Sequence, residues 1–177
     1  VVPEVKRAAE REFLNALWLL RLRKPEAAEA AERALLTART DPWIDRGLIE
    51  CDFGEWTGKE LKALAKLPEW QTVQQRPSAF RFPEGESFLE MSTRIVETLS
   101  TLTARHRGET VIAVSHADPI KAALAHYLGM HLDTFQRLIV APASVSVVID
   151  SASGIVVPEI SRISPPLPAD PDEAKTP

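Results

Sequence analysis

The stretch RHRGETVIAVSHADPIKAALAHYLGM (residues 105–130) contains the pattern that decides the fold. Its segment VIAVS (111–115) is a continuous apolar run, which is typical of a strand buried on both faces of a parallel sheet. The segment that follows predicts a helix over 118–129, with a proline in its first turn and a glycine near its end. His116 lies where the strand passes into this helix. His106 precedes the strand and therefore belongs at the opposite edge of the sheet.

The first half of the chain is predicted to be largely helical. Apolar residues at helical spacing predict a helix over residues 4–22 and a second one over 25–39. Residues 48–58 are expected to be a strand end that runs into a loop. A short amphipathic helix is predicted over 59–70, and residues 71–87 are expected to form a surface excursion.

The second half alternates helices and buried strands. The segment from residue 88 to about residue 106 predicts an amphipathic helix whose apolar face is formed by Phe88, Met91, Ile95, Leu99 and Leu102. Residues 144–150 and 154–160 are expected to be a terminal pair of strands. This alternation predicts a three-layer α/β/α domain with a mostly parallel sheet, in which ligands bind at the carboxyl ends of the strands.

Composition limits the class of protein. The chain has 177 residues, 45% of them hydrophobic, which is enough for one domain with a sizeable core, expected over residues 1–163. The Pro-rich, acidic segment 164–177 is predicted to be disordered. The net charge of −4 argues against binding of nucleic acid or of an anionic membrane, and no apolar run is long enough to span a bilayer. Cys51 is the only cysteine, so we expect no intramolecular disulfide, no cysteine metal cluster and a reducing, cytoplasmic setting.

Four histidines are candidates for chemistry. His116 precedes a helix start, which attracts phosphate, and a histidine there can donate a hydrogen bond or move a proton. The alternative for His116 is a structural histidine at a strand end, and these residues alone leave both possibilities open. His106 is interpreted as an exposed residue or a cation near a helix end. His126 and His131 have no partner at metal-ligand spacing, so no metal site is predicted.

Four segments, in chain order, resemble motifs of the histidine phosphatase (phosphoglycerate mutase-like) superfamily. They are LIECDFGEWTG (48–58), FPEGESFLEM (82–91), VIAVSHADPIKAALAHYLGM (111–130) and FQRLIVAPASVSVV (135–148). The third resembles the second-histidine motif of the family, in which an apolar strand and a Ser-His-Gly-like turn lead into a helix. The resemblance covers roughly residues 48–150 and implies the phosphoglycerate mutase-like fold.

The resemblance also implies roles for single residues. His116 would hold the phosphoryl group and stabilise charge during its transfer. Glu50 would be the acid that protonates the leaving oxygen and then the base for water, although without the motif it reads as a surface carboxylate. The backbone N–H of Ala117, where the family usually has glycine, would help to bind phosphate. Arg23 aligns with a phosphate-binding arginine of the family, and Arg21 is its competitor.

The start of the chain departs from the family pattern. The family begins with a strand that leads into Arg-His-Gly, whose histidine becomes phosphorylated, and we find neither feature in residues 1–47, a divergent part that we expect to be helical. The string RHRGET (105–110) carries an extra residue and follows a helix, so His106 is not a displaced nucleophile. Three functions remain open: a phosphomonoester phosphatase whose nucleophilic histidine is absent from this chain, an inactive phosphate-binding or regulatory relative, and a phosphoglycerate-type mutase.

The expected ligand is a small phosphorylated metabolite, and no cofactor is expected. Selectivity is predicted to come from residues 59–87, where Trp70, Phe80, Arg81 and Phe82 could contact an organic group, with simple packing as the alternative. A homo-oligomer is possible.

Overall fold

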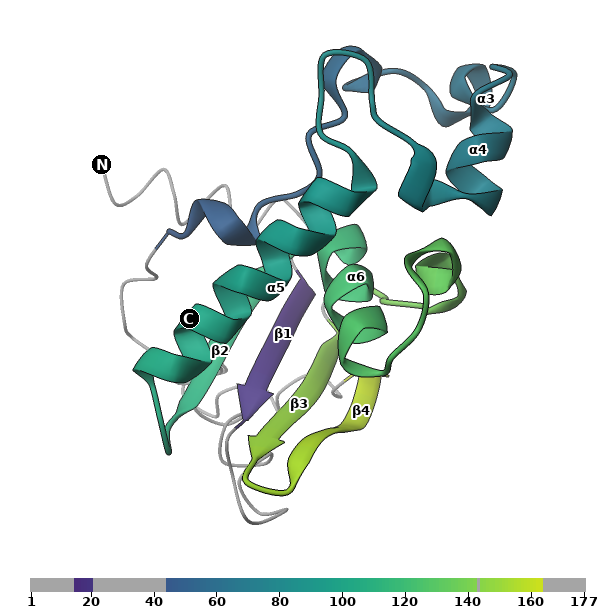
Figure 1. Cartoon of the computed structure of the whole chain (residues 1–177). Helices are drawn as coiled ribbons and strands as arrows, with labels where there is room; N and C mark the ends of the chain where they lie inside the picture. The colour runs from purple at the N-terminus through teal and green to yellow at the C-terminus, as the bar shows by residue number, and fades with distance from the viewer. Residues whose placement is uncertain (1–14, 21–43, 143, 164–177) are drawn as a thin grey trace, which may run out of the picture.

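The computed structural model describes residues 15–20, 44–142 and 144–163, with the backbone alone described for 15–20 (Figure 1). Four strands form one sheet in the order β2-β1-β3-β4. These strands are β1 (Asn15–Leu20), β2 (Thr110–Ser115), β3 (Val145–Ser151) and β4 (Gly154–Arg162). β1 runs antiparallel to β2 and parallel to β3, and β3 runs antiparallel to β4. The described sheet is therefore mixed, and the predicted mostly parallel sheet is not the one that forms.

β1 is the main difference from the sequence prediction. Asn15 pairs with Ser115 of β2, and Ala16 pairs with Val145 of β3, so β1 lies between two partner strands. The helix predicted over residues 4–22 is wrong at 15–20, and so is the expectation that the N-terminal part supplies no strand to the sheet. Pairing on both edges satisfies the backbone groups of this apolar segment, and tertiary pairing of this kind overrides helical spacing in the sequence.

α5 (Phe88–Arg105) follows the predicted helix closely. Ser87 and Glu90 form a capping box at its start, in which each side chain accepts a hydrogen bond from the other residue's backbone N–H. All five side chains of the predicted apolar face are buried. Because this face is fixed against the core, the polar residues beside it are held in defined positions.

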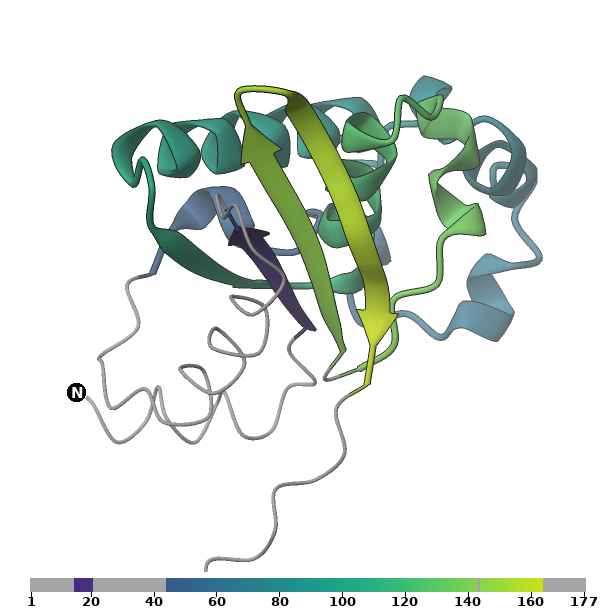
Figure 2. The same cartoon turned by 90° about the horizontal axis from the view of Figure 1, so that it is seen from below.

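α6 (Ala117–Tyr127) is the second long helix and follows β2 directly. It ends at a left-handed Gly129, with φ of +66°, as the sequence predicts. α5 and α6 cover the same face of the sheet (Figures 1 and 2). Neither helix lies on the opposite face, so the predicted three-layer arrangement is not confirmed. Val114 of β2 is 40% exposed, so this strand is not buried on both faces.

Short helical turns replace the strand predicted within residues 48–58. η1 (Arg46–Leu48) precedes an extended loop, and η2 (Gly54–Trp56) follows it. The helix predicted over 59–70 is reduced to α3 (Leu61–Leu64), and the predicted excursion contains α4 (Trp70–Gln75) and η3 (Pro77–Ala79). We call residues 53–82 the cap, which lies beyond the end of the sheet where α6 begins (Figure 1).

Aromatic rings join the cap to the rest of the molecule. Trp56 stacks on Trp70 with ring centroids 6.3 Å apart, and it also contacts Phe82 at 5.4 Å. Phe82 in turn contacts Phe88 of α5 at 5.1 Å, and Phe88 contacts Phe135 of η4 (Leu132–Arg137) at 5.4 Å. Edge-to-face and stacked pairs of this kind add to the stabilisation from burial. The cap is therefore fixed in position by its own core rings. No helix in the described ranges is long and apolar enough to cross a membrane.

Candidate active site

Glu50 and His116 come together from separate parts of the sequence. Oε2 of Glu50 lies 3.9 Å from Nδ1 of His116, and about a third of each side chain is exposed. Glu50 lies on the loop between η1 and η2. His116 follows β2 and caps the N-terminus of α6. The residues predicted from the family motifs as a functional pair thus lie side by side, in a position that solvent can reach.

A part-buried hydrogen bond places the Glu50 loop beside the end of β2. The hydroxyl of Ser115, which is 1% exposed, donates a hydrogen bond to the carbonyl oxygen of Leu48 at 2.7 Å. Ser115, the residue before His116, is therefore hydrogen-bonded to the segment that precedes Glu50. This bond holds the segment before Glu50 against the end of β2.

Burial gives Glu50 an unusual protonation behaviour. Desolvation raises the pKa of its carboxyl from 4.5 to about 7, and the nearby Asp118 carboxylate acts in the same direction. The Cys51 N–H donates to Oε1 of Glu50 at 2.9 Å, and this bond, with the charges of Lys121 and Arg94, opposes the rise. A carboxyl that is half protonated near neutral pH can both donate and accept a proton.

The start of α6 supplies backbone donors beside this pair. The first N–H groups of a helix have no partner within the helix, and the helix dipole favours an anion there. Ala117 is the first residue of α6, so its N–H belongs to this set. Asp118 also lies in the first turn, but Nζ of Lys121 lies 3.4 Å from its Oδ1 and Nε2 of Gln136 donates to the same oxygen at 3.2 Å. The negative charge of Asp118 is thus partly compensated.

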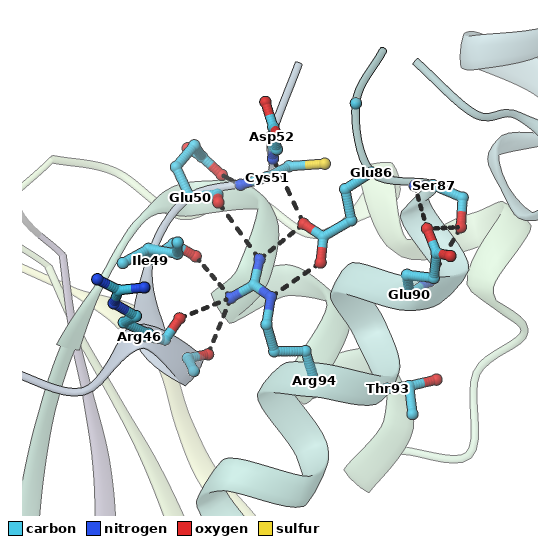
Figure 3. A network of polar contacts seen from close by, with 12 residues as sticks. Arg46, Ile49, Glu50, Cys51, Asp52, Glu86, Ser87, Glu90, Thr93 and Arg94 are labelled. Atoms are coloured by element: carbon cyan, nitrogen blue, oxygen red, sulfur yellow. Dashed lines mark hydrogen bonds and ion pairs between the residues drawn. The ribbon is translucent and has the colours of Figure 1, made fainter. Parts of the chain in front are cut away.

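Arg94 holds the loop that carries Glu50, a role that the sequence analysis missed (Figure 3). Its Nε and Nη2 donate to the two carboxylate oxygens of Glu86, each at 2.8 Å. Its Nη1 donates to the carbonyls of Gly47 and Ile49 at 3.0 and 3.1 Å, and Nη2 donates to the carbonyl of Glu50 at 3.3 Å. Nη1 also donates to the carbonyl of Arg46 at 3.5 Å. One guanidinium therefore joins α5 to four backbone carbonyls between Arg46 and Glu50.

The Glu86 segment interlocks with the loop as well. Glu86 N–H donates to the carbonyl of Asp52 at 2.9 Å. Gly54 has φ of +50°, and a Cβ there would lie 2.1 Å from the carbonyl oxygen of Pro83. A Cβ at Gly85 would lie 2.4 Å from the carbonyl oxygen of Asp52. The glycines in two of the family-like motifs thus permit the close approach of the two backbones.

The remaining predicted residues have varied outcomes. Trp70 and Phe82 line a cavity beside the site, whereas Phe80 is buried within the cap. Arg81 is exposed and paired with Glu90, away from the site. Arg21, Arg23, the helix predicted over 25–39 and the tail predicted over 164–177 lie outside the described residues.

The other histidines lie away from the Glu50–His116 pair in the fold. His106 follows the last residue of α5, at the opposite end of β2 from His116, and pairs with Glu109 at 2.9 Å. His126 is in the last turn of α6, and His131 caps η4. Within the ranges that the structure describes, no group of three or more His, Cys, Asp or Glu side chains could hold a metal ion. Burial raises the pKa of the Cys51 thiol, which keeps it neutral and poorly nucleophilic.

Known proteins resemble this chain in sequence and in fold. The family model of the histidine phosphatase superfamily (branch 1) matches residues 23–160. Phosphoserine phosphatase 1 from Hydrogenobacter thermophilus is 31% identical over 142 residues, which cover 78% of this chain and 65% of that protein. The chain thus spans slightly less than two thirds of this relative.

Solved structures agree in fold. YhfR from Bacillus stearothermophilus superposes with a TM-score of 0.67 and 24% identity, over 90% of this chain and 79% of that one. A mutant phosphoserine phosphatase from Entamoeba histolytica, in complex with phosphoserine, superposes with a TM-score of 0.61 and 16% identity, over 82% of this chain and 96% of that one. With the match over residues 23–160, these likenesses lead to one conclusion: the chain belongs to the histidine phosphatase superfamily, branch 1.

Proposed function

We propose that this chain binds small phosphomonoesters at the Glu50–His116 pair and supplies the phosphate-binding and acid–base groups for their hydrolysis. The observation that carries the proposal is the position of a carboxyl with a pKa of about 7, 3.9 Å from a histidine at a helix N-terminus. This arrangement combines a group that can donate a proton with donors for a phosphoryl group. Membership of a phosphatase superfamily supports the same reaction class.

In this proposal His116 and Ala117 bind the phosphoryl group, and Glu50 transfers protons. The His116 ring and the Ala117 N–H hold the phosphoryl oxygens and stabilise their charge. Neutral Glu50 gives its proton to the leaving oxygen as the P–O bond breaks and the phosphoryl group passes to the ring nitrogen of a histidine that this sequence does not supply. The Glu50 carboxylate then takes a proton from water as the water oxygen attacks phosphorus and the P–N bond breaks. Arg23 would add a further phosphate contact.

We further propose that the nucleophilic histidine is none of the four in this sequence. We assign His116 to binding of the phosphoryl group. The other three histidines lie at the end of α5 (His106), in the last turn of α6 (His126) and at the start of η4 (His131). An inactive phosphate-binding or regulatory relative is the second candidate, in which the same pair and the start of α6 bind a phosphoryl group without turning it over. A phosphoglycerate-type mutase is a third possibility that no separate contact supports.

The test is hydrolysis of p-nitrophenyl phosphate by the purified chain and three variants. Because the nucleophile is not among the residues of this sequence, we expect at most slow turnover by the wild-type chain, and we expect Glu50→Gln and His116→Ala each to reduce that rate by about 100-fold or more. His106→Ala is the matched control and should retain the wild-type rate. Activity that survives both site substitutions would refute the site assignment. No turnover, together with binding of methylphosphonate that is lost in His116→Ala, would favour the phosphate-binding relative.

A further inference from the structure

A cavity of about 500 Å³ lies between the cap and the start of α6. Eight of the side chains that line it are apolar, and five of these are aromatic. They are Phe53, Trp56, Leu61, Leu64, Trp70, Val73, Phe82 and Phe88. A dry apolar cavity of about 150 Å³ is enough to hold one benzene ring. This cavity can therefore receive an aryl group with room for substituents.

The cavity lies beside the candidate active site. Asp118 and Gln136 form part of its lining, and Asp118 lies two residues after His116. The charge of Asp118 acts on Glu50, so the two carboxyl groups are electrostatic neighbours. Phe53, another lining residue, follows Glu50 by three positions. A phosphoryl group at the Glu50–His116 pair would thus lie near the edge of the cavity that Asp118 lines.

The charges around the cavity limit the class of group that it accepts. Lys59 is the one cation among the described lining residues, and its side chain is exposed. The ammonium of Lys121 is already engaged with Asp118 and with Oε1 of Gln136, at 3.4 and 3.0 Å. A carboxylate on the ligand would meet Asp118 without a free buried cation to offset it. Like charges in such a position oppose binding.

We propose that this cavity binds the organic part of the substrate, and that the substrates are phosphate esters of uncharged, aryl or similarly apolar alcohols. The proposal rests on the proposed function, because it uses the Glu50–His116 pair as the phosphoryl site. Phosphorylated carboxylic acids are expected to be poor ligands. The rings of Trp56 and Trp70 supply the apolar wall, and the Asp118 carboxylate supplies the selection against anions.

Three phosphonates that the protein cannot hydrolyse separate the head group from the organic part. Methylphosphonate reports the phosphoryl site alone, benzylphosphonate adds an aryl group, and 3-phosphonopropionate adds a carboxylate. Isothermal titration of the purified chain should give at least about tenfold tighter binding of benzylphosphonate than of methylphosphonate, since the ring leaves water for an apolar wall. We expect 3-phosphonopropionate to bind no more tightly than methylphosphonate.

Two substitutions at exposed leucines locate the effect. Leu61 lines the cavity and is 69% exposed, so Leu61→Asp should fold and should weaken benzylphosphonate about fivefold or more while leaving methylphosphonate unchanged. Leu89→Asp, at a 55% exposed position of α5 outside the cavity lining, is the control and should change neither affinity.

The outcomes distinguish the two proposals. Methylphosphonate binding that His116→Ala removes, without a preference for benzylphosphonate, would overturn the substrate class and leave the proposed function standing. Tighter binding of 3-phosphonopropionate than of benzylphosphonate would overturn it as well. Failure of all three phosphonates to bind would overturn the proposed function and, with it, the substrate class.

Discussion

Replacing Arg94 with methionine should lower the free energy of unfolding by about 3 kcal/mol. The substitution keeps an apolar stem and removes the guanidinium that donates to both oxygens of Glu86 and to four backbone carbonyls. The Glu86 side chain is 15% exposed and would lose its cation. Removing one partner of a buried ion pair costs about 3–5 kcal/mol, and the remaining exposure of this pair places the effect at the low end.

Arg81→Met is the matched control. Arg81 also pairs with a glutamate, Glu90 of α5, but the two side chains are 57% and 51% exposed. Exposed ion pairs contribute at most about 1 kcal/mol, so this variant should remain close to the wild type. Urea unfolding followed by tryptophan fluorescence measures both changes under one set of conditions.

A double-mutant cycle tests the cause. Once Glu86 is replaced by methionine, adding Arg94→Met should cost much less than it costs in the wild-type chain, because the carboxylate that needs the cation is gone. Equal losses in Arg94→Met and Arg81→Met, or strictly additive losses in the cycle, would refute the reasoning. The charge of Arg94 also lowers the pKa of Glu50, so Arg94→Met should move the limb of the pH–activity profile set by Glu50 to higher pH.

Four further predictions concern Glu50, Gly54 and His106. In the proposed mechanism Glu50 is the acid, and its pKa is about 7, so activity should fall as the pH rises above 7; a flat profile from pH 6 to 9 would contradict this role. The same raised pKa means that the folded state holds a proton that the unfolded state loses between pH 4.5 and 7. Wild-type stability should therefore fall across this window relative to Glu50→Gln, by roughly 1 kcal/mol after allowing for the exposed third of the side chain, as measured by urea unfolding. Gly54→Ala should destabilise the protein by about 2 kcal/mol or more, because its Cβ would collide with a backbone carbonyl. Gly58→Ala is the control and should cost about 1 kcal/mol, because Gly58 has φ of +75° but no atom within 4 Å of the added Cβ. Similar melting curves for the two variants would contradict the close approach of the two loops. His106→Ala should alter the unfolding free energy by less than about 0.5 kcal/mol, because its pairing with Glu109 is on the surface, and a larger loss in thermal unfolding would show a structural role.

Local patterns predicted the helices around the site well. The apolar face of α5 and the glycine at the end of α6 were both predicted from short segments, and each has a local physical cause. The placement of His116 at the strand-to-helix junction followed from the same kind of pattern. The pairing of His116 with Glu50 needed the resemblance to a family, because no spacing in the sequence brings residues 50 and 116 together.

Long-range pairing and buried polar contacts were not predictable in this way. β1 has an apolar spacing that suits a helix, and its strand conformation depends on partners almost one hundred or more residues away. The sequence gives only a weak indication of the role of Arg94, which is that a charged residue lies next to the buried positions Met91 and Ile95 of a helix. The carbonyls that it binds belong to a loop with no regular pattern, so the sequence offered no partner for it.

The position of β1 has a consequence for how the protein is made. Its two neighbours, β2 and β3, come from the last part of the described chain, so most contacts of the sheet join segments that are distant in sequence. Such a high contact order slows folding, since a large loop must close before the pairing stabilises it. During synthesis, β1 leaves the ribosome long before residues 145–149 exist to pair with it. A nascent chain that stalls before this point leaves an apolar strand edge open to other chains.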